Sequence, residues 1–250
     1  RRSSDLENVS AARVSYTFQR MFAAEDSDTR VHFSIGQAGL TLNNSDFRLF
    51  EFRMQNNGDL RVEYSRDGEG GDRGSTNVGS YDTGNPNEAV LFVNSHGSEP
   101  VAYNDGTLSG LLAPNTLDVY VNGDFIGTYL TLKTPDPDNA PQIDFWSSDA
   151  DLGQIAFYQD SSRQGGMVID SILVQELPLG GGEPGEELQV YIDNYDFEED
   201  TVGEQPILPF PTSFSPSSND ANNGFVVVDA ASATPNPMDT GQALYAYDFV

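Results

Sequence analysis

Carboxylate side chains form the most chemically suggestive group in this chain, between positions 193 and 200. Asp193, Asp196, Glu198, Glu199 and Asp200 follow one another closely there. Carboxylate and carbonyl oxygens are the ligands of Ca²⁺, which takes about six to eight of them. Calcium is therefore the metal that these residue types favour. The alternative is a set of solvated carboxylates along the edge of a strand.

A second group of aspartates lies in a stretch rich in proline and other turn residues. Asp149-Ala150-Asp151 has the spacing of a calcium loop, but the full EF-hand pattern is missing. A solvated loop is the interpretation that we favour for the whole group, which comprises Asp136, Asp138, Asp144, Asp149 and Asp151.

The charge balance restricts the partners. The formal net charge is −27, from 39 acidic and 12 basic residues, and Lys133 is the one lysine. A chain with so few cations cannot neutralise many phosphates, so we expect it to bind neither nucleic acid nor an anionic membrane surface. The same charge either attracts divalent cations or is screened by salt.

Several chemistries are excluded by composition. The chain has 250 residues and no cysteine, which excludes a disulfide framework, a thiolate metal site and a cysteine nucleophile. No apolar run reaches the roughly 20 residues of a membrane span, so we expect no membrane insertion.

Short alternating runs, separated by Gly, Asn, Asp and Pro, fill most of the chain. Asn57-Gly58 separates the runs 46–55 and 60–67, and Asn122-Gly123 interrupts the run 116–132. An Asn-Gly pair between alternating runs is a strong hairpin signal. About a dozen such runs, with almost no helical periodicity, predict an all-β fold: a two-sheet antiparallel β-sandwich.

Three segments resemble a known family. LDVYVNGDFIGTY (117–129), GQIAFYQDSSRQGGMVIDSILV (153–174) and DFEEDTVGEQP (196–206) resemble the central hairpin, the last hairpin and the opening strand of concanavalin-like, laminin-G-like jelly rolls. Bacterial members of this family occur in secreted or surface proteins. The resemblance therefore implies a jelly roll in an extracellular or cell-surface protein.

The order of these segments is permuted relative to the family, in which 188–250 would precede 1–177. We therefore divide the chain into an incomplete jelly-roll body (1–178), a Gly-rich linker (179–187) and a complementing strand segment (188–250). A sandwich that lacks its first strands would expose unpaired edges and apolar surface. The segment 188–250 by itself is too small to hold a core.

Two geometries would join these parts. The complementing segment can fold back onto its own body, as a permuted monomer or a piece of a tandem repeat. It can also cross into the next subunit by donor-strand complementation, which makes a head-to-tail homopolymer, a filament or sheath. The core residues that the exchanged segment would carry are Phe197, Phe225, Val227, Leu244 and Tyr247.

The resemblance also implies a structural calcium ion between the opening strand and the last strand. The matching positions are Asp170, Asp196 and Glu198. An ion there would bridge the complementing segment and the body, so assembly would be stabilised by calcium. The alternative is that these carboxylates face solvent.

Carbohydrate binding is the other common use of such jelly rolls, and it defines an alternative function: a lectin-like module with a polysaccharide partner. The aromatic candidates are Trp146, the only tryptophan, with Tyr81 and Tyr103 in polar loops. The alternative for each ring is a place in the core or at its rim.

Catalysis has little support from the motifs. The acidic run of jelly-roll glycosidases is absent, and so are a nucleophile elbow and a phosphate-binding loop. His32 is expected on a pleat face of a strand and His96 in an exposed loop. The sequence therefore predicts a non-enzymatic structural subunit.

Overall fold

The structure is a computed structural model, in which part of the chain is described. The described residues are 9–22, 30–36, 48–65, 73–131, 152–159, 165–177, 190–195, 197, 200, 202, 212–215, 223–229 and 242–248. All regular elements among them are strands. The part of the chain that the structure describes contains no helix long and apolar enough to cross a membrane.

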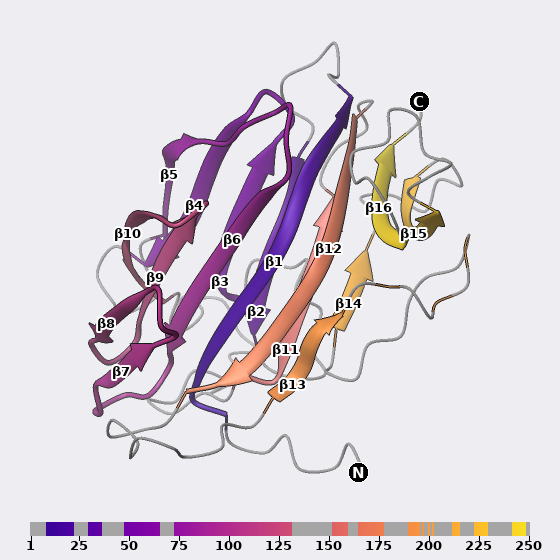
Figure 1. Cartoon of the computed structure of the whole chain (residues 1–250). Coiled ribbons are helices and arrows are strands. Elements are labelled where there is room, and N and C mark those ends of the chain that lie inside the picture. The colour runs from indigo at the N-terminus through magenta and orange to yellow at the C-terminus, as the bar shows by residue number, and fades with distance from the viewer. Residues whose placement is uncertain are drawn as a thin grey trace, which may run out of the picture.

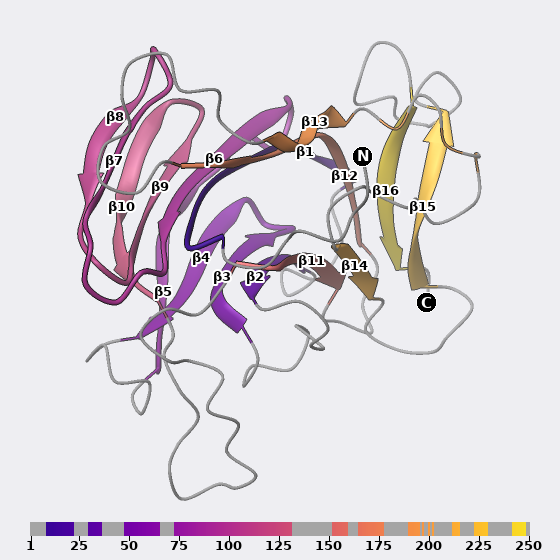
Figure 2. The same ribbon diagram turned by 90° about the horizontal axis from the view of Figure 1, so that it is seen from below.

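The strands form two layers that pack face to face, which confirms the predicted two-sheet sandwich (Figures 1 and 2). One layer consists, in spatial order, of β14 (Thr212–Ser215), β11 (Gln154–Gln159), β2 (Arg30–Gly36), β3 (Arg48–Gln55), β4 (Asp59–Ser65) and β5 (Arg73–Ser80). The other consists of β10 (Asp124–Leu130), β9 (Thr116–Val121), β6 (Asn87–Asn94), β1 (Ala11–Phe22), β12 (Gly165–Glu176), β16 (Gln242–Asp248) and β15 (Asn223–Asp229). β13 (Val190–Tyr195) also pairs with β12.

Among the described residues, one pair joins the layers at one side, Leu130 of β10 with Ser65 of β4. At the other side β16 and β15 continue the sheet beyond β12 (Figure 2), and β15 approaches β14. Nearly all neighbours are antiparallel, as predicted. The exception is β14, which runs parallel to β11.

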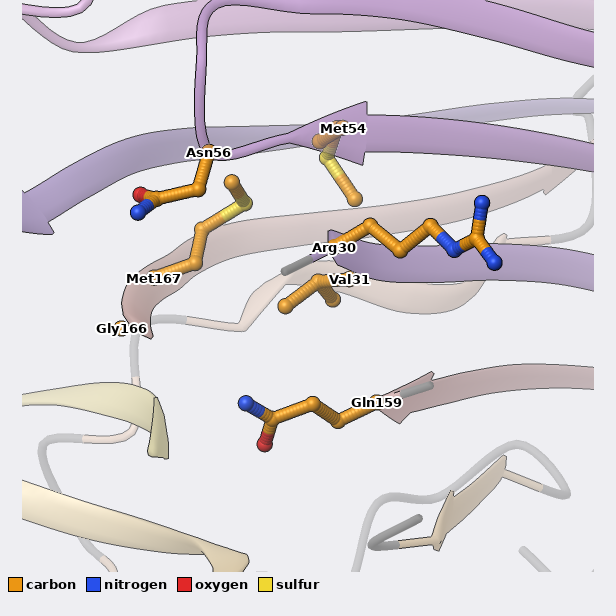
Figure 3. A pocket seen from close by; sticks show the side chains of 7 residues that line it. All are labelled: Arg30, Val31, Met54, Asn56, Gln159, Gly166 and Met167. Carbon is orange, nitrogen blue, oxygen red and sulfur yellow. The ribbon is translucent and has the colours of Figure 1, made fainter. Parts of the chain in front are cut away.

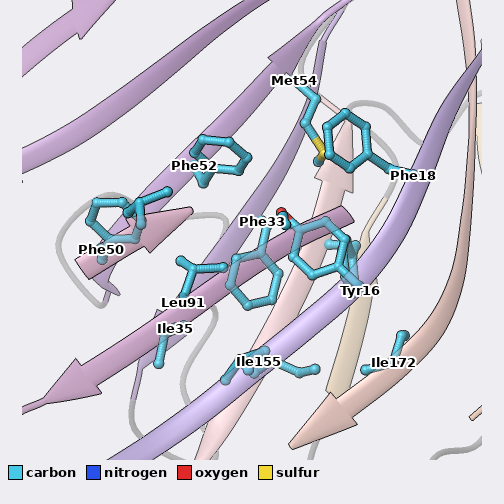
Figure 4. Close-up of a cluster of buried hydrophobic side chains, with 14 of the residues drawn as sticks. Tyr16, Phe18, Phe33, Ile35, Phe50, Phe52, Met54, Leu91, Ile155 and Ile172 are labelled. Carbon is cyan, nitrogen blue, oxygen red and sulfur yellow. The ribbon is translucent and has the colours of Figure 1, made fainter. Parts of the chain in front are cut away.

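The core lies between the layers and follows the alternation of the strands. Tyr16 and Phe18 point inward from β1 toward the opposite layer, where the Tyr16 ring lies beside Phe33 (Figure 4). The Tyr16 ring lies 4.8 Å from that of Phe33 and 5.2 Å from that of Phe157. Each fully buried side chain of this size contributes about 1.5–3 kcal/mol, so this aromatic cluster is a main source of stability.

A smaller apolar cluster lies under the hairpin of β7 (Val101–Asn104) and β8 (Ser109–Leu112). Tyr103 stacks on Phe92 at 3.9 Å between ring centroids. The predicted hairpin at Asn122-Gly123 is also present between β9 and β10, and both residues have positive φ, 53° and 81°. Two positive φ values are the requirement of a type I′ turn, which explains the Asn-Gly pair.

Candidate assembly site

The outer edge of β12 is where the complementing segment joins the body. The inner edge of β12 pairs with β1 over almost its whole length. Its outer edge is shared by two strands: Gly165–Ile169 pairs with β16, and Ile172–Gln175 pairs with β13. Both partners lie beyond residue 187, so two separate pieces of the complementing segment complete one long strand of the body.

A β-bulge in β12 separates the two pairing regions. Ser15 and Thr17 of β1 lie opposite Leu173 and Asp170, so the register shifts between these pairs. Ser171 has a φ of 53°, and its amide donates to Oδ1 of Asp170 at 2.7 Å. A bulge bends its strand and increases the local twist. The bend falls between Ile169, the last residue paired with β16, and Ile172, the first paired with β13.

Phe197 is the residue of the complementing segment that enters the core of the body. It is 1% exposed and belongs to the same apolar cluster as Tyr16 and Phe18. The predicted burial of Phe197 is thus confirmed, while its role in assembly stays a prediction. Its φ of 65° is unusual for a bulky residue and costs on the order of 1–3 kcal/mol. Burial of the ring is large enough to offset that cost.

The other predicted assembly residues are placed by strand register. Leu244 pairs with Ile169 of β12 on one side and with Val227 of β15 on the other. Tyr247 pairs with Gly166 and with Gly224, and Phe225 pairs with Ala246. β14 pairs with β11 and so extends the layer that contains β2, β3, β4 and β5. The complementing segment therefore extends both layers, in the folded-back geometry. The predicted linker, 179–187, lies outside the described residues.

The proposed calcium ligands are only partly described. Asp170 lies at the bulge and is half-buried. Asp196 and Glu198 lie outside the described residues, as do all the aspartates of the second acidic group. Within the described part of the chain, no three His, Cys, Asp or Glu residues are grouped closely enough to hold a metal ion. The three-residue calcium site stays a prediction.

The aromatic candidates for sugar binding have different outcomes. Trp146 lies outside the described residues. Tyr81 is 6% exposed, and its hydroxyl donates to the carbonyl oxygen of Gln55 at 2.7 Å. Tyr103 is 4% exposed, and its hydroxyl lies 2.6 Å from Oδ2 of Asp118. Tyr81 and Tyr103 therefore take the alternative given for them, a place in the core, because their hydroxyls have protein partners and their rings complete the apolar clusters.

A buried ionic cluster on the outer face of β11, β2 and β3 was not foreseen from the sequence. Oε1 of Glu51 lies 3.0 Å from Nδ1 of His32 and also accepts from Arg53, while Oε2 accepts from the hydroxyl of Tyr158. The His32 ring stacks on the Tyr158 ring at 4.3 Å. In the sequence, each of these four residues lies next to a core residue of its strand. That alternation could have indicated that the four side chains share the opposite face of the sheet.

Glu51 and Arg53 form the charged pair of this cluster. Burial lowers the pKa of the Arg53 guanidinium, but the charge interactions with Glu51, Glu63 and Tyr158 and the hydrogen bond to Glu51 together outweigh burial, so that pKa is raised overall. Arg53 also donates to Glu63 at 3.0 Å. Both oxygens of Glu51 are engaged by neighbouring strands, which suits a carboxylate that ties strands together. The expected position of His32 on a pleat face is confirmed, although the ring is buried, at 1% exposed.

His96 occupies a loop, as predicted, and is half-exposed. Its Nδ1 accepts hydrogen bonds from the backbone amides of Ser98 and Glu99, at 3.2 and 3.0 Å. This histidine therefore stabilises its own turn.

No protein-family model matches this chain, and no curated protein is similar to it. Among solved structures, it is similar to sheep galectin-11 in a complex with glycerol, with 14% identity and a TM-score of 0.31 over 49% of this chain and 73% of that one. The CBM40 of Ruminococcus gnavus IT-sialidase, bound to α2,3-sialyllactose, has 13% identity and a TM-score of 0.32 over 61% and 68%. A sialidase has 10% identity and a TM-score of 0.34 over 97% of this chain and 13% of that one. Such low scores support no inference about function, and the fold assignment rests on the strand pairing.

Proposed function

We propose that this protein is a non-catalytic, extracellular structural subunit that polymerises head to tail by donor-strand complementation. The observation that supports the proposal most is the outer edge of β12, whose partners among the described residues are all strands beyond residue 187. Phe197 adds to it, because a residue of the complementing segment occupies the core of the body. A segment that supplies both edge strands and a core side chain is the kind of element that subunits exchange.

The folded-back and exchanged forms contain the same strand pairs, so their free energies differ mainly through the linker and the cost of association. The linker contains Gly180, Gly181, Gly182 and Gly185, which favour a flexible chain. A short flexible linker gives a segment an effective concentration on the order of millimolar for its own body. Exchange is therefore favoured where chains are concentrated while they fold. It reverses slowly, because several strands must separate together.

Calcium stabilisation of this junction is the second part of the proposal. Asp170 lies two residues from Ile172, whose partner is Tyr195, and Asp196 follows Tyr195 in the chain. Their carboxylates, with that of Glu198, are the oxygen donors that Ca²⁺ prefers. A bound ion would neutralise charge at the junction. We expect a chelator to lower the melting temperature and Asp170→Asn to abolish the response to calcium. An unchanged melt in chelator would contradict this part.

Engineered disulfides test the strand exchange, since the chain has no cysteine of its own. Val168 of β12 lies directly opposite Tyr245 of β16. The variant Val168→Cys with Tyr245→Cys is refolded at roughly micromolar and roughly millimolar concentrations, on either side of the effective concentration. After oxidation, exchange gives a ladder of covalent oligomers at the higher concentration, and folding back gives covalent monomers.

A second pair within the body serves as the matched control. Thr17 of β1 lies opposite Glu88 of β6, so Thr17→Cys with Glu88→Cys must link within one chain under all conditions. A ladder from the first pair and monomers from the control would support the proposal. Monomers from both pairs at both concentrations would overturn it.

A further inference from the structure

The turn between β3 and β4 contains an asparagine whose side chain is bonded to its own turn. This turn lies at the end of the sandwich where Met54 and Asn56 line a small pocket (Figure 3). Asn57 is exposed, and the backbone amide of Asp59 donates to its Oδ1 at 2.9 Å. Nδ2 of Asn57 donates to Oδ2 of Asp59, also at 2.9 Å. A side-chain oxygen bonded to the amide two residues further on forms an Asx turn.

An Asx turn brings together the two atoms that react when an asparagine loses its amide. It curls the side chain back over the next residue, so Cγ of Asn57 is carried toward the backbone nitrogen of Gly58. Reactants held in this orientation need little further ordering before attack. The Asp59 amide at Oδ1 is also placed to stabilise the negative charge that develops there. Gly58 has no side chain that could obstruct the attack.

Asn122-Gly123, in the turn between β9 and β10, has the same residue types in a different arrangement. Its Oδ1 accepts from the backbone amide of Glu88, and its Nδ2 donates to Oδ1 of Asn87, both at 2.9 Å. Asn87 is 1% exposed. The carboxamide of Asn122 is therefore held from both sides by another part of the chain. It must give up both hydrogen bonds before the nitrogen of Gly123 can attack it.

Two further asparagines have the Asx geometry without a following glycine. The backbone amide two residues further on donates to Oδ1 of Asn77 and to Oδ1 of Asn104, each at 3.0 Å. The next residues are Val78 and Asp105, whose side chains crowd the attacking nitrogen. Of these four asparagines, Asn57 alone combines the Asx turn with a glycine.

We propose that Asn57 is a site of spontaneous deamidation in the folded protein. The backbone nitrogen of Gly58 loses its proton to base and attacks Cγ of Asn57. A bond forms between these two atoms, the bond between Cγ and Nδ2 breaks, and Nδ2 takes a proton from water and leaves as ammonia. A second water molecule then opens the succinimide ring, which leaves an aspartate or an isoaspartate at position 57. This inference goes beyond the proposed function and does not depend on it, because the turn belongs to the body.

The modification would alter a turn that holds its surroundings. The Gly58 amide donates to the carbonyl oxygen of Gln55, and the Gly58 carbonyl accepts from the amide of Tyr81, both at 2.9 Å. Tyr81 belongs to the core. An isoaspartate inserts one extra atom into the backbone of this turn, and either product places a second carboxylate beside Asp59. We therefore expect the modified protein to melt at a lower temperature.

Peptide mass spectrometry tests the proposal on the full chain. The native protein and the protein in concentrated urea are incubated side by side in mildly alkaline buffer, and deamidation is followed at each asparagine. In the native protein, Asn57 should convert at least about fivefold faster than Asn122, Asn77 or Asn104, because only its reacting atoms are prearranged. In urea, Asn57 and Asn122 should convert at similar rates, because the folded arrangement is lost and both precede glycine.

Asn57→Gln is the matched control, since attack on the longer side chain would form a less favourable six-membered ring. Its melting temperature should stay constant during native incubation, whereas that of the parent should fall as the products accumulate. Four results would each overturn the proposal. They are native conversion of Asn122 at the rate of Asn57, the same preference for Asn57 in urea, no conversion of native Asn57 while the urea sample converts, and an equal fall in the melting temperature of Asn57→Gln.

Discussion

The two edges of β12 are built in opposite ways. Its inner edge pairs with the single strand β1 over almost its whole length, with two shifts of register, and its outer edge is divided by the bulge at Ser171 between β16 and β13. The inner pairing belongs to the body and to its aromatic core. The outer pairing depends on a segment that follows a Gly-rich run in the sequence. One strand can thus be permanent on one side and replaceable on the other, which is the requirement for an acceptor in strand exchange.

Deletion of residues 188–250 should change the folding of the chain most, because it removes β13 and β16, which pair with the outer edge of β12. The truncated body would expose the outer edge of β12 and the space that Phe197 fills, so we expect it to aggregate. Sedimentation and circular dichroism after expression would measure this result. A soluble, folded, monomeric fragment would show that the body is complete by itself.

Phe197→Ala tests the same junction in the full chain. The ring is buried in the core, so its loss should lower the free energy of unfolding by about 3–5 kcal/mol. Val202→Ala is the control, because Val202 is 52% exposed, and it should change stability by less than about 0.5 kcal/mol. Urea denaturation measures both variants. Equal stabilities of the two would mean that Phe197 does not anchor the segment.

Tyr16→Phe tests the core beneath β1, the strand that pairs with the inner edge of β12. The Tyr16 hydroxyl is buried without a partner in the described structure, so its removal should raise the free energy of unfolding by about 1 kcal/mol. Tyr81→Phe is the matched control and should lower it by about the same amount, because the Tyr81 hydroxyl donates to Gln55. Opposite signs in urea denaturation are the expected outcome, and a destabilised Tyr16→Phe would contradict the structure here.

Tyr16 also gives the body a dependence on alkaline pH. Burial raises the pKa of Tyr16 well above its usual value. An unfolded tyrosine ionises near pH 10. The free energy of unfolding is therefore not affected by Tyr16 ionisation below about pH 10, and it falls as the pH rises from there toward the folded pKa, because only the unfolded chain releases the proton. Tyr16→Phe should therefore lose less stability than the parent between about pH 10 and 11. Identical alkaline slopes would exclude Tyr16 as a source of this dependence.

Ser171→Gly should have the smallest effect. Ser171 is in the left-handed region, where glycine has no steric cost, but glycine also gains entropy in the unfolded chain. We expect a net stabilisation of about 0.5 kcal/mol. Asn115→Gly, at a φ of 57°, should be closer to neutral because Asn tolerates this region. A clear loss of stability in Ser171→Gly would mean that the bulge depends on the serine side chain.

Local patterns in the sequence predicted the parts of the fold that depend on neighbours in the chain. The short alternating runs predicted strands, and Asn122-Gly123 predicted the turn between β9 and β10. The same patterns did not show that Tyr81 and Tyr103 are buried, because polar neighbours in sequence need not be neighbours in space. They also missed the cluster around Glu51, which needs three strands in one register.

The sequence by itself determined that this chain is an all-β sandwich, because side-chain period and turn chemistry are local properties. Only the tertiary structure decided which edge the last strands complete and where Phe197 is buried. Those outcomes depend on pairings between residues far apart in the chain, and a shift of one residue would move each side chain to the opposite face.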